Sequence, residues 1–191
     1  MGLANKLTFL RLVLSPAFFV VYLFFNGAGW TVPALWLIFI ISEITDLLDG
    51  LAARKLNEAS DFGRLFDPFA DTIMQITCFM CFVIDGIFPA ILFLLVVYRE
   101  LGILFIRNLM LKKGVTLAAR MGGKIKTVAY IVAESAALIV VTLQRLSVFE
   151  SLSPYFKTGA VIIFLISVII SVVSFFDYLV IYRKTKSNHA G

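Results

Sequence analysis

The chain has 191 residues, of which 61% are hydrophobic and 15% are charged. This composition is typical of a polytopic membrane protein and excludes an ordinary soluble domain, in which apolar residues make up about 45–50%. The net charge of +5 favours contact with anionic lipid and phosphate, and we expect no nucleic-acid partner.

Six apolar segments are long enough to cross a membrane, since a helical span needs about 20 residues. We expect these spans at residues 7–26, 32–56, 61–84, 88–111, 123–144 and 158–182. The predicted fold class is therefore all-α, a single membrane domain over residues 1–191. Of the 17 Lys and Arg residues, all but Arg145 and Lys157 fall on one side of the membrane or in helix ends that lean toward it. The positive-inside rule then predicts a protein of the cytoplasmic membrane with both termini in the cytoplasm.

The first expected span is preceded by a polar stretch that contains Asn5, Lys6, Thr8 and Arg11. Basic side chains at the end of a span can extend toward lipid headgroups while their stems stay in apolar surroundings. The pattern predicts a short amphipathic segment at the membrane interface, with Lys6 and Arg11 reaching the headgroups.

Four aspartates, Asp46, Asp49, Asp67 and Asp71, lie in the second and third expected spans. A carboxylate near the bilayer centre costs about 2.5–3.5 kcal/mol, so four of them need a shared counter-charge. Asp46 and Asp49 are three residues apart, and Asp67 and Asp71 are four apart, so each pair lies on one face of a helix. Two antiparallel helices would bring the four carboxylates together at the cytoplasmic membrane face. Such a site suits magnesium, calcium or manganese, and two divalent ions would balance the four charges.

The residues between the aspartate pairs suit a phosphate ligand. Gly50, Ala53 and Gly63 would let a substrate approach the backbone closely, and Arg54 could pair with a diphosphate. These features predict a nucleotide diphosphate held by metals. A structural ion-pair network is the alternative, but residues 43–71 offer three basic residues to seven acids.

The spacing of these residues is specific: Asp46-x2-Asp49-Gly50-x2-Ala53-Arg54-x8-Gly63-x3-Asp67-x3-Asp71. It resembles the full signature of the CDP-alcohol phosphotransferase family, membrane enzymes that transfer a phosphatidyl or related group from a cytidine-diphosphate donor to an alcohol. The resemblance implies that Asp71 is the general base and that Asp46, Asp49 and Asp67 are mainly metal ligands. It also implies two Mg²⁺ or Mn²⁺ ions and a homodimer.

Secondary motifs resemble the phosphatidylglycerophosphate synthase branch of that family. Asn5-x-Leu-Thr8-x-x-Arg11 matches its opening, although Ala4 stands where Pro is usual, and it implies that Asn5 and Thr8 contact the donor. Arg99-Glu-x6-Arg107 and Gly123-Lys-x-Lys-Thr127 follow in the same order, but Thr72 stands where that branch has Lys. The resemblance implies CDP-diacylglycerol as donor and glycerol 3-phosphate as acceptor, with inositol phosphate, serine or another alcohol as alternatives.

The charge of the acceptor indicates which residues could bind it. Glycerol 3-phosphate is close to a dianion at neutral pH, so a site that selects it needs fixed cations near the aspartates. Arg107, Lys124 and Lys126 are the best candidates. Arg107 can reach the aspartates from the cytoplasmic half of the fourth expected span, and the two lysines lie at the start of the fifth, where a helix N-terminus also favours an anion. Arg120 and Arg99 are weaker candidates.

A small cation or proton transporter is the alternative from another class of protein, since intramembrane carboxylates can relay ions. A transporter does not require Gly50, Ala53 and Arg54 at fixed offsets from the aspartates, and no inverted repeat is apparent. We expect the other intramembrane acids, Glu134 and Asp177, to pair with charges on neighbouring helices or to line the interior.

Overall fold

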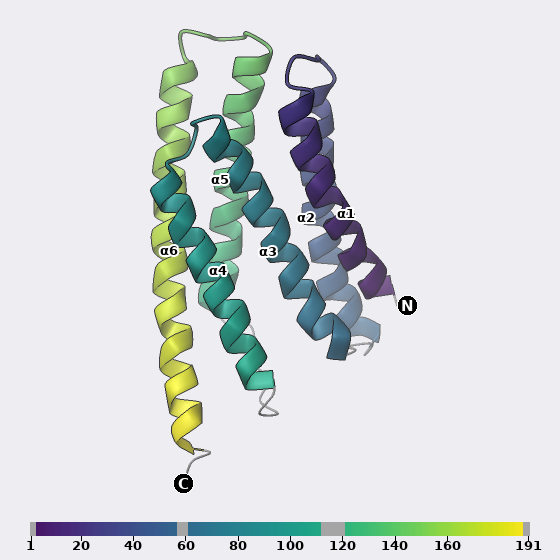
Figure 1. Ribbon diagram of the computed structural model, residues 1–191, viewed down its shortest axis with the longest axis vertical. Helices are drawn as coiled ribbons and strands as arrows, with labels where there is room; N and C mark the ends of the chain where they lie inside the picture. Colours follow the sequence, from purple (N-terminus) through teal and green to yellow (C-terminus); the bar gives the residue numbers. More distant parts are fainter. Residues whose placement is uncertain (1–2, 57–60, 112–120, 189–191) are drawn as a thin grey trace.

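The computed structural model describes residues 3–56, 61–111 and 121–188, without the side chains of residues 3–5, 49–56, 61–65, 121, 181 and 184–188. All regular elements in these ranges are helices: α1 (Leu3–Phe24), α2 (Thr31–Leu56), α3 (Asp61–Ile84), α4 (Ala90–Leu111), α5 (Met121–Arg145) and α6 (Ser153–Asn188). Figure 1 shows the helices running along the long axis of the molecule. The start of α1 and the end of α6 lie toward the same end of the bundle, and the all-α prediction is confirmed.

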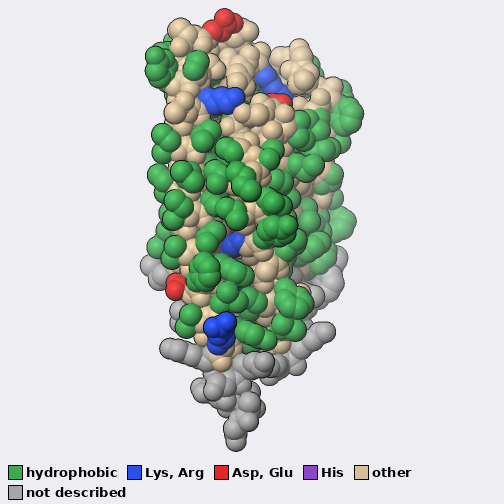
Figure 2. All heavy atoms as spheres, turned by 60° about the vertical axis from the view of Figure 1, so that its left-hand side comes forward, with side chains coloured by type: hydrophobic (Ala, Val, Ile, Leu, Met, Phe, Trp, Pro, Cys, Tyr) green, Lys and Arg blue, Asp and Glu red, His purple; other side chains and the backbone are tan. Residues whose placement is uncertain are grey.

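Five of the helices are long and apolar enough to cross a membrane, at Lys6–Phe24, Thr31–Leu48, Phe66–Ile84, Gly122–Arg145 and Ser153–Val180. Helix α4 is not among them, because Arg99, Glu100 and Arg107 interrupt its 22 residues. On the face shown in Figure 2, hydrophobic side chains cover the middle of the bundle and most charged side chains lie nearer its two ends. The chain is therefore an integral membrane protein.

The helices pack in two groups that meet chiefly at α3, with a smaller contact between α2 and α5. Helix α1 packs against α2 and α3, α6 packs against α4 and α5, and α3 also contacts α4 and α5. The rings of Phe79, Phe88, Tyr130 and Phe164 meet at the centre: Phe164 lies 4.9 Å from Phe79 and 4.1 Å from Phe88 between centroids. Because lipid is as apolar as these rings, the gain comes from close packing, and each aromatic pair adds about 0.5–1.5 kcal/mol.

The turn between α3 and α4 sets the direction of both helices. Gly86 takes a positive φ of 64°, a conformation that favours glycine and commonly ends a helix. The carbonyl oxygen of Phe82 then accepts the backbone N–H of Ile87 at 2.8 Å. Pro89 follows and α4 begins at Ala90, two residues after the predicted start.

The N-terminal polar stretch differs from its prediction. From Leu3 onward it is the first part of α1, so the described residues contain no separate interfacial segment. Lys6 is exposed, as expected, but Arg11 is only 1% exposed. The prediction that Arg11 reaches the headgroups is therefore wrong, because its side chain has acidic partners inside the bundle.

Candidate active site

Helix α1 connects the acids of α2 and α3. Nη1 of Arg11 lies 2.7 Å from Oδ1 of Asp46, and the same nitrogen forms an ion pair with Oδ1 of Asp71. The hydroxyl of Thr8, three residues before Arg11, donates to Oδ1 of Asp67. One face of α1 therefore binds three of the four signature aspartates and brings them to one region.

The predicted metal ligand Asp49 and the remaining predicted donor contacts are placed by their backbone only. Their helices are α1 for Asn5, α2 for Asp49, Gly50, Ala53 and Arg54, and α3 for Gly63. The side chains of these residues are outside the described set, and Arg120 lies outside the described residues altogether. On α2, Asp49 follows Asp46 by three residues, which puts both on one helical face.

The donor atoms fit a hard divalent cation. Asp46 and Asp71 each place a carboxylate oxygen on the same guanidinium nitrogen, so two oxygens from different helices are close together. Carboxylate oxygens are the ligands that Mg²⁺ and Mn²⁺ prefer. Among the side chains that the structure describes, no three acids form one compact group, so the fit rests on this pair, with Asp67 beside it.

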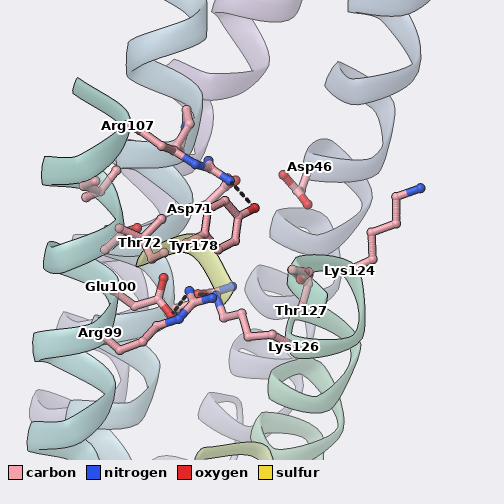
Figure 3. A pocket seen from close by; sticks show the side chains of 15 residues that line it. Asp46, Asp71, Thr72, Arg99, Glu100, Arg107, Lys124, Lys126, Thr127 and Tyr178 are labelled. Carbon is pink, nitrogen blue, oxygen red and sulfur yellow. Dashed lines mark hydrogen bonds and ion pairs between the residues drawn. The ribbon is translucent and has the colours of Figure 1, made fainter. Parts of the chain in front are cut away.

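A cavity of about 190 Å³ opens beside these acids and is drawn in Figure 3. Its lining comes from five helices: Asp46 of α2; Pro68, Asp71, Thr72 and Gln75 of α3; Arg99, Glu100, Ile103, Leu104 and Arg107 of α4; Gly123, Lys124, Lys126 and Thr127 of α5; and Tyr178 of α6. The cavity thus joins two of the signature aspartates to the basic residues of α4 and α5.

The predicted acceptor cations differ in how they face this cavity. Arg107 and Asp46 lie on opposite sides of it, and the guanidinium of Arg107 lies 3.5 Å from the hydroxyl of Tyr178. Lys124 is at the rim, is exposed, and extends its ammonium away from the cavity. Of these two residues, Arg107 is better placed to bind an anion there.

Lys126 belongs to a buried cluster of charges. Its Nζ lies 3.0 Å from Oε1 of Glu100 and donates to Oε1 of Gln75, also at 3.0 Å. Glu100 in turn pairs with Arg99 at 2.9 Å, and Arg99 donates to the carbonyl oxygen of Ser171. Arg99 and Lys126 therefore share the carboxylate of Glu100 at the cavity wall, and each member of the cluster has a partner.

Several residues at the site are not among the candidates that the sequence predicts. Gln75 follows Asp71 by four residues and could have been found by helical spacing. Tyr178, 2% exposed and 71 residues from its partner Arg107, carries no such signal. Glu134 is buried, whereas Asp177, for which the sequence predicts a charged partner or an interior position, is exposed on α6.

The fold and the site together define a class of protein. It is an integral membrane protein that carries the aspartate signature of enzymes with cytidine-diphosphate donors, and two of these aspartates line one cavity with buried basic residues. The model of the CDP-alcohol phosphatidyltransferase family matches residues 1–173. The chain belongs to this family.

Curated relatives support the same assignment. The chain is 37% identical to a CDP-diacylglycerol–glycerol-3-phosphate 3-phosphatidyltransferase of Treponema pallidum, over 94% of this chain and 88% of the relative. It is 34% identical to a protein of the same name from Bacillus subtilis, over 72% of this chain and 77% of the relative. A third protein of that name, from Cereibacter sphaeroides, is 30% identical over 76% of this chain and 66% of the relative.

Family membership settles the class of function. The chain is a transferase of phospholipid biosynthesis, in a family that generally depends on divalent metal. The alternative of a cation or proton transporter is therefore wrong. The spacing of glycine, alanine and arginine around the aspartates, which a transporter would not need, is the sequence feature that distinguishes the two.

Proposed function

We propose that this enzyme transfers the phosphatidyl group of CDP-diacylglycerol to glycerol 3-phosphate and releases CMP. The observation that carries the proposal is the cavity that Asp46, Asp71 and Arg107 line together, with Arg107 across from Asp46. Carboxylates suit a metal-bound diphosphate, and a guanidinium suits the phosphate of the acceptor. The names of the three relatives support the same substrates.

The donor side of the site would be built on α1, α2 and α3. Two Mg²⁺ or Mn²⁺ ions, held by Asp46, Asp49, Asp67 and Asp71, would neutralise the diphosphate and stabilise the charge that develops on the leaving CMP. The remaining proposed donor contacts share small size or the ability to bind phosphate: Asn5, Thr8, Gly50, Ala53, Arg54 and Gly63.

Asp71 is the proposed general base. The primary hydroxyl oxygen of glycerol 3-phosphate forms a bond to the lipid-bearing phosphorus, the bond from that phosphorus to the oxygen of CMP breaks, and Asp71 takes the hydroxyl proton. Asp71 is supported in this role because it lines the cavity together with the acceptor cations. The guanidinium of Arg11, which also pairs with Asp46, orients the carboxylate of Asp71.

The acceptor side would be formed by Arg107, with Lys126 and Lys124 contributing less directly. Arg107 presents a guanidinium to the cavity, and a guanidinium can donate two parallel hydrogen bonds to a phosphate. Lys126 adds positive charge from the buried cluster with Glu100. Arg120 stays a candidate from the sequence alone.

A substrate panel tests the proposal. Purified protein with CDP-diacylglycerol and Mn²⁺ or Mg²⁺ would be offered glycerol 3-phosphate, inositol phosphate, inositol, serine and choline, and CMP release would be followed. We expect release with glycerol 3-phosphate. Release with inositol phosphate or serine but not with glycerol 3-phosphate would overturn the acceptor and leave the aspartate chemistry standing. Thr72, which lines the cavity where the related branch has Lys, keeps inositol phosphate in the panel.

We propose six spans with the site and both termini in the cytoplasm, in the cytoplasmic membrane. For the sixth span, α4, the support is that its charged residues Arg99 and Glu100 are buried against α5 and α6 instead of facing lipid. The orientation is supported by the excess of Lys and Arg on one side. The homodimer implied by the family resemblance is tested by the mass of the purified protein in detergent.

A further inference from the structure

Arg11 is the most completely buried charged residue of α1, with 1% of its surface exposed. Its Nη1 contacts Oδ1 of Asp46 on α2 at 2.7 Å and is paired with Oδ1 of Asp71 on α3. A small cavity of about 20 Å³ is lined by Arg11 together with both aspartates. The guanidinium therefore occupies the oxygens that the proposed metal site would use.

The packing of the helices makes this contact important. Helices α2 and α3 each pack extensively against α1, and within the described ranges they touch each other far less. Asp46 and Asp71 are thus brought together chiefly through α1. The guanidinium is buried, whereas the carboxylates of Asp46 and Asp71 are partly exposed. Removal of Arg11 therefore leaves two carboxylates of like charge close together without the cation that they share.

The positive charge of Arg11 competes with a divalent cation for the same carboxylate oxygens. Arg11 and Thr8 contact Asp46, Asp67 and Asp71, and Glu43 lines the same small cavity as Arg11. The acids there outnumber the single positive charge that Arg11 supplies. A divalent cation that binds Asp46 and Asp71 must share their oxygens with the guanidinium or displace it. Arginine keeps its charge at all relevant pH values, so this competition does not depend on protonation.

We propose that Arg11 is a positioning residue that holds Asp46 and Asp71 together and competes with the divalent cation for them. Arg11 thereby stabilises the metal-free enzyme and lowers its affinity for metal. The cation binds most favourably when the diphosphate of the donor arrives and adds negative charge to the site. This inference rests on the proposed role of the aspartates as metal ligands.

Direct measurement of Mn²⁺ binding tests the inference. Full-length protein in detergent, without donor, would be titrated with Mn²⁺, and free Mn²⁺ would be followed by electron paramagnetic resonance. Arg11→Gln should bind Mn²⁺ on the order of tenfold more tightly than wild type, a difference of about 1.4 kcal/mol. Its melting temperature should fall in EDTA and rise with Mn²⁺ by more than that of wild type, because bound ligand stabilises the folded state.

Two further variants sharpen the result. Arg107→Gln removes the same charge from the neighbouring cavity without touching Asp46 or Asp71, so it should change Mn²⁺ affinity much less. Arg11→Lys keeps the charge but lacks the planar fork, and should fall between wild type and Arg11→Gln. If Arg11→Gln does not fold, Arg11→Lys decides the question by the same titration.

The possible results of the titration distinguish a failure of the proposed competition by Arg11 from a failure of the proposed metal site. Unchanged or weaker Mn²⁺ binding by Arg11→Gln, or by Arg11→Lys where only that variant folds, would overturn the competition. An equal increase in Arg107→Gln would also overturn it, because the effect would then be one of general charge. If neither wild-type protein nor Arg11→Gln binds Mn²⁺, with or without CDP-diacylglycerol, the proposed metal site fails instead.

Discussion

Replacement of Arg107 by alanine should impair the use of glycerol 3-phosphate and spare the use of CDP-diacylglycerol. Arg107 is partly buried, lines the cavity opposite Asp46, and has the hydroxyl of Tyr178 3.5 Å from its guanidinium. A hydrogen bond to a charged group contributes about 1.5–3 kcal/mol, and each 1.4 kcal/mol is a factor of ten. The loss of one such bond should raise the KM for glycerol 3-phosphate about 10- to 150-fold.

The assay is CMP release at saturating CDP-diacylglycerol with varied glycerol 3-phosphate, repeated with the two substrates exchanged. Lys124→Ala is the matched control, because Lys124 is also a cation at the rim but points its ammonium away from the cavity. Its KM for glycerol 3-phosphate should rise much less than that of Arg107→Ala. The reasoning is refuted if Arg107→Ala leaves the KM for glycerol 3-phosphate unchanged, or if Lys124→Ala raises it as much.

Lys126 is a less direct probe of the same question. Its ammonium is buried against Glu100 and Gln75, so Lys126→Ala removes one partner of a buried pair. Such a change costs about 3–5 kcal/mol of stability. We expect a raised KM for glycerol 3-phosphate, accompanied by a lower melting temperature that Arg107→Ala does not share.

Three further predictions concern the acids. Asp46→Asn and Asp67→Asn should each lower kcat/KM by about 100-fold or more, and wild-type turnover should stop in excess EDTA; full activity in EDTA would contradict the metal site. Asp71→Asn should keep binding CDP-diacylglycerol but lose the chemical step in single-turnover experiments, and a variant that loses binding instead would remove Asp71 from the role of base. Glu100→Gln should lower the melting temperature because two buried cations lose their shared carboxylate, and adding Lys126→Gln should restore part of it; no recovery would mean that the pair is not the cause.

The fold and the donor motif were accessible from the sequence for a physical reason. A helix in lipid must satisfy its backbone internally and present apolar side chains, so hydropathy alone locates most spans. The expected segment at 61–84 coincides with α3, because polar residues precede it and Gly86 ends it. The spacing of Asp67 and Asp71 likewise predicts their common face, because residues four apart lie on the same side of any α-helix.

Side-chain direction is harder to predict, although part of it could have been found. Lys124 and Lys126 are two residues apart on α5, and residues at that spacing do not share a helical face. The charge argument nevertheless groups them as acceptor ligands, whereas Lys124 points outward and Lys126 is buried. The partners of Arg11 could not be inferred in this way, because Asp46 and Asp71 are 35 and 60 residues further along the chain.

Helix α4 shows how charged residues within a predicted span can contribute to the site. Arg99, Glu100 and Arg107 place three charges in α4, in a segment that is otherwise apolar and that hydropathy predicts as the span at 88–111. Arg99 and Glu100 are buried against α5 and α6, and Arg107 faces the cavity. Charged residues within the membrane are expensive unless they are paired or serve a ligand. The charges of α4 are therefore consistent with the proposed acceptor site, because Arg99 and Glu100 are paired inside the bundle and Arg107 lines the cavity where the anionic acceptor is proposed to bind.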